Sequence, residues 1–175
     1  MSLKVIMGLG NPGSRFTFTR HNIGFRVLDA LAEKHGSTWS TQGNKEIAQI
    51  MINDQKLLLV KPLTFMNSSG EVLPSLTKKG ISADEMVVVH DELEKQFGKV
   101  WWKTGGSPKG HNGLRSIIER IGKNFHRVQV GIGRPLSKAA VPDYVLDKFP
   151  PDEESNIPHI LEEAVTVLEN KITGE

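Results

Sequence analysis

Short runs of hydrophobic residues alternate along the chain with amphipathic stretches of helical length. Residues 3–9 are almost continuously apolar, and residues 86–91 and 127–132 have the same character. Such runs, bounded by glycine or polar residues, are typical of strands buried on both faces of a sheet. Residues 99–103 predict a further strand. Side chains alternate in direction along a strand, so one of its two adjacent tryptophans is expected to face outward.

The amphipathic stretches predict four helices, at residues 23–35, 69–79, 114–121 and 151–171. A glycine follows each of the first three and ends it. The second and fourth contain Pro74 and Pro158. Proline fits only the first turn of a helix, so we expect a kink or a later start in both.

Residues 46–52 and 56–61 flank the dipeptide Asn53-Asp54 and predict a β-hairpin. Because strands otherwise alternate with helices, this hairpin implies a mixed, mostly parallel sheet. We therefore expect a single domain over residues 1–175 with a three-layer α/β/α fold, in which a twisted sheet carries helices on both faces. The length and the 38% hydrophobic content suffice for a core without metal or disulfide support.

The chain has no cysteine, which excludes disulfide bonds, thiolate catalysis and zinc bound through sulfur. No apolar run approaches the roughly 20 residues that a membrane-spanning helix needs. The N-terminal apolar run meets Gly8 too early to form the hydrophobic region of a signal peptide. We therefore expect an intracellular, soluble protein without a membrane partner.

Charge is distributed unevenly, although the net charge is only +2. Residues 95–138 hold ten lysines and arginines against one acidic residue, a net charge of +9. Residues 139–175 hold two basic and nine acidic residues, a net charge of −7. A basic block within a folded domain is typical of a protein that binds a polyanion. A solvated face shows the same bias, so charge alone leaves both interpretations open.

The segment Gly8-Leu9-Gly10-Asn11-Pro12-Gly13 follows the first predicted strand and matches the pattern of a dinucleotide-binding turn. That turn must lead directly into a helix whose free N–H groups hold a pyrophosphate. Here Pro12 removes one N–H, the following residues are aromatic and β-branched, and no acid ends a second strand at the required distance. We interpret the segment as a tight turn and expect no nucleotide cofactor.

Polar side chains stand where predicted strands give way to loops or helices. His21 comes just before a predicted helix and is expected to lie beside Asn11, and Asp91 ends a buried strand. Asp91 could orient an imidazole there, or it could cap the backbone amides of the next turn. Asn67 and Asn112 could each bind a substrate amide or cap the helix that follows.

Two common hydrolytic arrangements are not found in the sequence. There is no His-Glu-x-x-His motif and no cluster of aspartates, so we expect no metal site. A Gly-x-Ser-x-Gly elbow is also absent, which disfavours a serine nucleophile.

Eight segments, taken in order, carry a resemblance to a known family. They are GLGNPG (residues 8–13), TRHNIGF (19–25), KPLTFMNSSG (61–70), HDEL (90–93), GGS (105–107), GHNGL (110–114), VGIGRP (130–135) and VPDYVL (141–146). Together they closely resemble the bacterial-type peptidyl-tRNA hydrolase family, which is also found in mitochondria. The likeness runs from residue 3 to about residue 150. Any one segment is weak evidence, whereas the ordered set is highly specific.

The resemblance implies a reaction and its main groups. His21 matches the general base that activates water for attack on the ester between a peptide and the terminal ribose of tRNA. Asp91 matches the acid that orients this imidazole. Asn11 matches the residue that discriminates substrates with an N-blocked aminoacyl end from those with a free one. Histidine suits the role because its ordinary pKa lies close to neutrality.

The resemblance also implies where the substrate binds. Phe65, Asn67 and Asn112 match contacts with the peptidyl and 3′-terminal part of the substrate. Phe16 stands where a tyrosine is common, so stacking is kept and a hydroxyl is lost. His111 resembles part of a mobile gate over the cleft.

Lys103 matches a family lysine that grips the terminal phosphate of tRNA, but Gln129 replaces its usual arginine partner. Arg127, Lys109 and Arg134 are the candidates to compensate. The basic block then has a natural partner in peptidyl-tRNA, through its 3′ CCA end and acceptor stem, because lysine and arginine bind phosphate arrays.

These observations favour a metal-independent ester hydrolase that uses no cofactor and acts as a monomer. We expect it in the cytoplasm, or in the mitochondrial matrix if the source is eukaryotic. A non-catalytic RNA-binding relative would keep the fold and the basic face. The intact His21, Asp91 and asparagines argue against that alternative, since binding alone needs no base.

Overall fold

The computed structural model describes residues 2–174, which form one seven-stranded sheet and six α-helices. The strands are β1 (Val5–Gly8), β2 (Ser40–Gln42), β3 (Lys45–Ile52), β4 (Gln55–Pro62), β5 (Met86–Glu92), β6 (Val100–Thr104) and β7 (His126–Gly131). The helices are α1 (Ile23–Lys34), α2 (Leu73–Thr77), α3 (Asn112–Ile121), α4 (Val141–Leu146), α5 (Pro151–Glu154) and α6 (Ile157–Thr173).

The strand order across the sheet is β2-β3-β4-β1-β5-β7-β6. The central strands β4, β1, β5 and β7 run parallel, whereas the pairs toward the two edges, β2–β3, β3–β4 and β6–β7, are antiparallel. The predicted mixed sheet is therefore confirmed, with its parallel pairs at the centre. Between β3 and β4, Asn53 and Asp54 both have positive φ angles, 49° and 62°, which form the predicted two-residue hairpin turn.

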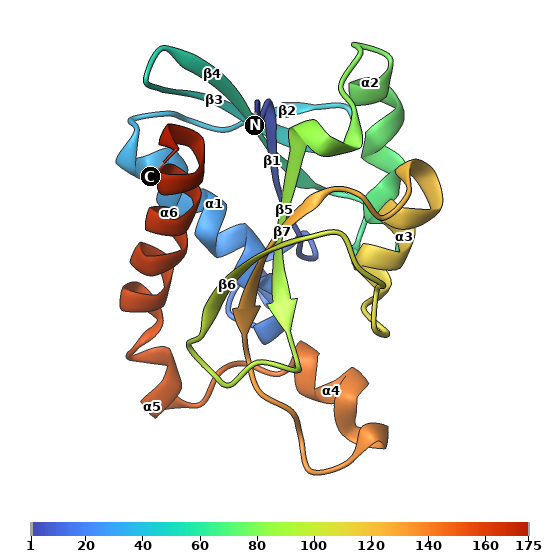
Figure 1. Cartoon of the computed structure of the whole chain (residues 1–175). Helices are drawn as coiled ribbons and strands as arrows, with labels where there is room; N and C mark the ends of the chain where they lie inside the picture. Colours follow the sequence, from blue (N-terminus) through green and yellow to red (C-terminus); the bar gives the residue numbers. More distant parts are fainter. Residues whose placement is uncertain (1, 175) are drawn as a thin grey trace.

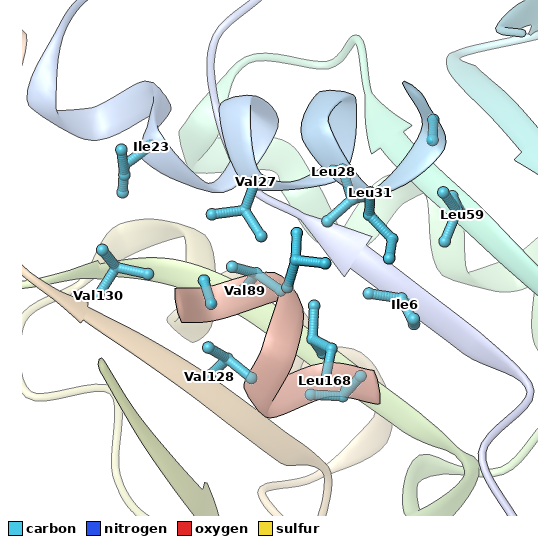
Figure 2. Close-up of a cluster of buried hydrophobic side chains, with 14 of the residues drawn as sticks. Ile6, Ile23, Val27, Leu28, Leu31, Leu59, Val89, Val128, Val130 and Leu168 are labelled. Carbon is cyan, nitrogen blue, oxygen red and sulfur yellow. The ribbon is translucent and has the colours of Figure 1, made fainter. Parts of the chain in front are cut away.

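Helices cover both faces of the sheet, as predicted, because side chains alternate in direction along each strand. On β1, Ile6 points into a core shared with α1 and α6, whereas Val5 and Met7 point into a second core shared with α2 and α3. Figure 1 shows α1 and α6 on one side of the sheet and α2 and α3 on the other. In the first core, Leu28 of α1 and Leu168 of α6 pack against the strands (Figure 2). Each such leucine contributes roughly 1.5–3 kcal/mol to folding.

The direction of the chain across the sheet reverses at β1. From β1 the chain passes through α1 to β3 and β4 on one side, and from β4 it returns through α2 to β5 on the other side. Open α/β sheets bind ligands at such a switch point, outside the carboxyl ends of the strands. Asn11 follows β1 and Asp91 lies near the end of β5, so both stand at this edge of the sheet.

Two glycines allow α1 to begin directly against the sheet. A Cβ atom at Gly24 would lie 2.4 Å from the carbonyl oxygen of Val89 and 2.7 Å from the amide nitrogen of Leu9. A Cβ atom at Gly8 would lie 2.5 Å from the carbonyl oxygen of Gly24. These contacts are too short for any side chain. Because Gly8 and Gly24 have no side chain, the first turn of α1 can lie directly against the ends of β1 and β5.

The two prolines determine where their helices begin. The helix predicted over residues 151–171 is divided into α5 and α6, and Pro158 lies in the first turn of α6. Pro74 takes the same place in α2, which follows a 3-10 helix, Met66–Val72. The expected later start is confirmed in both cases. Within residues 2–174, none of the helices combines the length and the apolar character that a membrane span requires.

The sequence pattern misses two elements, β2 and α4. Strand β2 is three residues long and fully exposed, and α4 buries only Val145, so neither has a hydrophobic periodicity to detect. On β6 the outward ring is that of Trp101, which is 54% exposed, whereas Trp102 packs against the first core. The expectation that one tryptophan faces outward is confirmed.

We predict that Gly24→Ala destabilises the protein by roughly 1–3 kcal/mol, because the methyl group forces backbone atoms of two strands apart. Chemical denaturation followed by circular dichroism measures the change. Glu33→Ala, at an exposed position of the same helix, is the control and should stay within about 0.5 kcal/mol of the wild type. Equal denaturation midpoints for Gly24→Ala and the wild type would contradict the close contact.

Candidate active site

His21 lies in a 3-10 turn, Arg20–Asn22, directly before α1. Arg20 anchors this turn to α4. Its guanidinium lies 3.8 Å from the centre of the Tyr144 ring and donates a 2.9 Å hydrogen bond to the Tyr144 carbonyl oxygen. Anchored in this way, the His21 side chain is 13% exposed and meets the end of β5.

Asp91 of β5 accepts a hydrogen bond from Nδ1 of His21, over 2.8 Å between Nδ1 and Oδ2. Burial alone would raise the pKa of Asp91, but the neighbouring imidazoles of His21 and His111 outweigh burial and hold the pKa well below its usual range. Burial lowers the pKa of His21, and the Asp91 carboxylate more than reverses this, so the pKa of His21 is raised. Asp91 is thus an anion that orients His21 and favours its protonated form.

His111 shares the same carboxylate from the opposite side. Its Nε2 lies 2.8 Å from Oδ1 of Asp91, and its Nδ1 accepts the backbone N–H of Leu114 over 3.2 Å. A nitrogen that accepts a hydrogen bond carries no proton, so the N–H that His111 directs at Asp91 is on Nε2. His21 donates through Nδ1, and its Nε2 has no hydrogen-bond partner within residues 2–174. That nitrogen is available as a base.

Two clefts meet at His21. The larger, of 330 Å³, is lined by Asn11, Phe16, Phe65 and Asn67 on one side of the histidine. The smaller, of 160 Å³, is lined by groups that include Asp91, Lys109 and His111. His21, Asn112 and the α4 residues Pro142 and Val145 line both clefts. The structure therefore brings together all the predicted site residues except Lys103.

The amide of Asn11 has a defined orientation. Its Oδ1 accepts the backbone N–H of Met66 over 2.7 Å, which leaves the NH₂ end as the part of the side chain that can donate into the cleft. Asn22 fixes the backbone of Asn11 through two reciprocal bonds of 2.9 Å, one from the Asn11 N–H and one to its carbonyl oxygen. Asn11 is buried, so this arrangement is rigid.

The alternative roles as helix caps are wrong for Asn67 and Asn112. Phe65, with φ 67° and ψ 155°, holds the cap position before Asn67, and His111 caps α3, of which Asn112 is the first residue. The alternative that Asp91 caps a loop is also wrong, since its oxygens bind the two histidines. Positive φ is strained for an aromatic residue. It leaves Phe65 half exposed, with its ring edge-on to Phe16 at 6.4 Å.

Lys103 lies on β6, outside both clefts, with its Nζ close to Gly106 of the following loop. Gln129, the replacement for the family's usual arginine, is buried and donates a 2.9 Å hydrogen bond to Glu92. Its amide is therefore engaged within the protein. Gln129 supplies no cation to pair with Lys103.

Two of the three candidates to replace that arginine are already engaged. Arg127 is 1% exposed and donates to the carbonyl oxygens of Gly106 and Ser107, so it supports the loop that ends at His111. Arg134 forms an ion pair with Glu94. Lys109 is exposed and forms no ion pair within the described part of the chain.

Sequence reasoning missed several residues of the site. Met66 offers only a backbone N–H, Val145 belongs to a helix without hydrophobic periodicity, and Asn22 uses its side-chain amide to hold the backbone of Asn11. All three lie within segments of the family resemblance, but the residue types alone indicate none of these roles. His90 is buried and donates through Nδ1 to the carbonyl oxygen of Asp91. Burial, with a smaller effect of the neighbouring His111, lowers the pKa of His90 to about 3, so this residue is neutral.

The glycine-rich segment at the edge of the site does not form a dinucleotide-binding turn. After Gly13 the chain makes a 3-10 turn, Ser14–Phe16, and not an α-helix with free N–H groups. This geometry agrees with the interpretation of residues 8–13 as a tight turn.

Comparison of the sequence with known proteins finds one family, peptidyl-tRNA hydrolase, by two routes. The family model described as peptidyl-tRNA hydrolase matches residues 5–175. A peptidyl-tRNA hydrolase from Rubrobacter xylanophilus is 45% identical over 163 residues, which cover 93% of this chain and 92% of the relative. One from Rickettsia canadensis is 40% identical, with 95% of this chain and 94% of the relative covered.

Solved structures agree with the sequence comparisons. The crystal structure of peptidyl-tRNA hydrolase from Acinetobacter baumannii superposes with a TM-score of 0.93 at 38% identity, covering 98% of this chain and 89% of that one. A purine nucleoside phosphorylase from Toxoplasma gondii, with a TM-score of 0.55 at 9% identity, shares the fold alone. With a family model over nearly its whole length and close relatives of the same name, the chain belongs to the peptidyl-tRNA hydrolase family.

Proposed function

We propose that the protein hydrolyses the ester that joins a peptide, or an N-blocked amino acid, to the 3′-terminal ribose of tRNA, and so recycles tRNA from stalled or aborted translation. The observation that carries this proposal is the pairing of His21 with Asp91 at a cleft wall, with Nε2 of the imidazole left without a partner among the described residues. The family assignment supports an ester hydrolase.

His21 acts as a general base in this proposal. Nε2 takes a proton from water as the water oxygen attacks the ester carbonyl, and Asp91 stabilises the imidazolium that forms. The imidazolium then returns the proton to the ribose oxygen as the ester bond breaks. Asn67 and Asn112 line the same cleft as His21, and their amides can donate to the oxyanion.

Asn11 provides a basis for rejecting free aminoacyl-tRNA. Its NH₂ end is a hydrogen-bond donor, held in place by Met66 and Asn22, and it suits the carbonyl oxygen of a peptide bond. An unblocked aminoacyl end offers an ammonium group and no such carbonyl. The donor would then remain unpaired in a buried position, which costs roughly 1–3 kcal/mol.

The tRNA part of the substrate is assigned to the basic side of the molecule. Lys109 lines the smaller cleft, and Lys103 lies on β6 beside the loop that leads to it. These lysines can hold phosphates of the 3′ CCA end and acceptor stem. We propose that the protein acts as a monomer in the bacterial cytoplasm, or in the mitochondrial matrix if its source is eukaryotic.

We predict that His21→Ala lowers cleavage of N-acetyl-aminoacyl-tRNA by about 10²–10⁴-fold, because the general base is lost. The assay contains a metal chelator, with free aminoacyl-tRNA as a second substrate that should stay intact. His159→Ala, at an exposed position on α6, is the matched control and should keep full activity. A wild-type protein that is folded, binds tRNA and cleaves neither substrate would favour the RNA-binding alternative.

We predict that Asp91→Asn lowers kcat and moves the acidic limb of the pH profile to lower pH. The carboxylate raises the pKa of His21, so its removal leaves burial, which lowers that pKa. The base is then neutral at a lower pH than in the wild type. Measurement of kcat/KM between about pH 5 and 9 tests the shift. A limb that moves upward, or does not move, contradicts this role for Asp91.

We predict that Lys103→Ala raises KM more than it lowers kcat and reduces the salt dependence of binding by about one phosphate contact. Steady-state kinetics at several salt concentrations provide both quantities. Lys56→Ala, exposed at the start of β4, is the control for a general charge effect. The phosphate role is wrong if both variants change the salt slope equally.

A further inference from the structure

The groups that orient the candidate base also form a compact set of metal-binding atoms. Within residues 2–174, His21, Asp91 and His111 are the one group of three histidine or acidic side chains whose ligand atoms all lie within 4.8 Å of one another. We propose that this cluster binds Zn²⁺ and that the bound ion inhibits the enzyme. The binding site stands on geometry alone, whereas the inhibition rests on the proposed function.

The geometry needs only a small adjustment to hold the ion. Both imidazole nitrogens already face the Asp91 carboxylate at 2.8 Å, one at each oxygen. Zinc lies about 2.0–2.2 Å from nitrogen and oxygen ligands, which places ligands of one tetrahedral ion roughly 3.3–3.5 Å apart. Small side-chain rotations therefore bring the two nitrogens and one carboxylate oxygen onto a single ion.

The surroundings of the cluster leave room for a fourth ligand. The side chains of His21 and His111 are 13% and 11% exposed, and both line the 160 Å³ cleft, so an ion can enter from solvent. Water from the cleft can complete the coordination. No lysine or arginine forms an ion pair with Asp91 within the described residues, so its negative charge is opposed only by the histidines.

The chemistry of the donor set selects the metal. Two imidazoles and one carboxylate match the three protein ligands that zinc uses when a position is open to water. Mg²⁺ prefers six oxygen ligands in octahedral geometry and binds imidazole poorly. The Mg²⁺ that accompanies tRNA is therefore not expected to compete for this site.

Zinc at this site removes the base by moving a proton. A neutral imidazole carries one N–H, which His21 uses at Nδ1 to donate to Asp91. When the ion takes Nδ1, that proton moves to Nε2, which can then no longer accept a proton from water. On His111 the ion takes Nε2 and the proton moves to Nδ1, which ends the hydrogen bond from the Leu114 N–H.

Calorimetric titration of metal-free protein with ZnCl₂, without tRNA and with excess Mg²⁺, tests the binding. We expect one ion per chain and a Kd at least about tenfold weaker in His111→Asn, since one ligand is lost. Asparagine is a good N-cap, so this variant keeps the start of α3. His35→Gln is the matched control, because His35 pairs with Glu169 far from the cleft. Equal binding by His111→Asn and the wild type, or loss of binding in His35→Gln, overturns the site.

Nitrogen-15 NMR of the histidine side chains tests the proton shift. At alkaline pH, chosen above the raised pKa of His21 so that its imidazole starts neutral, saturation with Zn²⁺ should change His21 from the Nδ1–H to the Nε2–H tautomer. Retention of Nδ1–H at saturation overturns the assigned ligand atom. Both measurements omit substrate, so they separate the two proposals. Zinc binding without esterase activity refutes only the proposed function, and cleavage without zinc binding refutes only the metal site.

Discussion

The carboxylate of Asp91 is the group on which the site depends, because two imidazoles from distant parts of the chain share it. His21 approaches one oxygen and His111 the other, each at 2.8 Å. Asp91 is 2% exposed, and an ionised acid in such a position is costly unless charge or hydrogen bonds compensate. The need to satisfy this one group couples the turn before α1 to the loop before α3.

The backbone holds both histidines in reach by two separate means. Because Gly24 has no side chain, the start of α1 packs directly against the backbone of Val89 and Leu9. This contact places His21 close to the end of β5. On the other side, the buried Arg127 donates to loop carbonyl oxygens and supports the chain that leads to His111. The close packing at Gly24 and the buried cation of Arg127 thus position the two histidines that bind the same carboxylate.

The parts of the fold and site that could be predicted are those with local patterns. Apolar runs reveal the central strands, and polar residues at strand ends indicate that Asn11, His21 and Asp91 share one edge. The orientation of the side chains in the site depends on contacts between residues that are distant in sequence. Nothing local shows that Asn112 starts a helix while His111 caps it, or that α4 covers both clefts. Short exposed elements such as β2 bury too little to leave a pattern.

The basic block illustrates why a charge count overstates a binding surface. Of its ten cations, Arg127 is buried against loop carbonyl oxygens, Arg134 is paired with Glu94, and Lys95 lies over the exposed ring of Trp101. A cation that is already engaged releases few counterions from RNA, and each phosphate contact contributes separately to the salt slope. In the proposed function, the affinity for tRNA should therefore depend less steeply on salt than a net charge of +9 suggests.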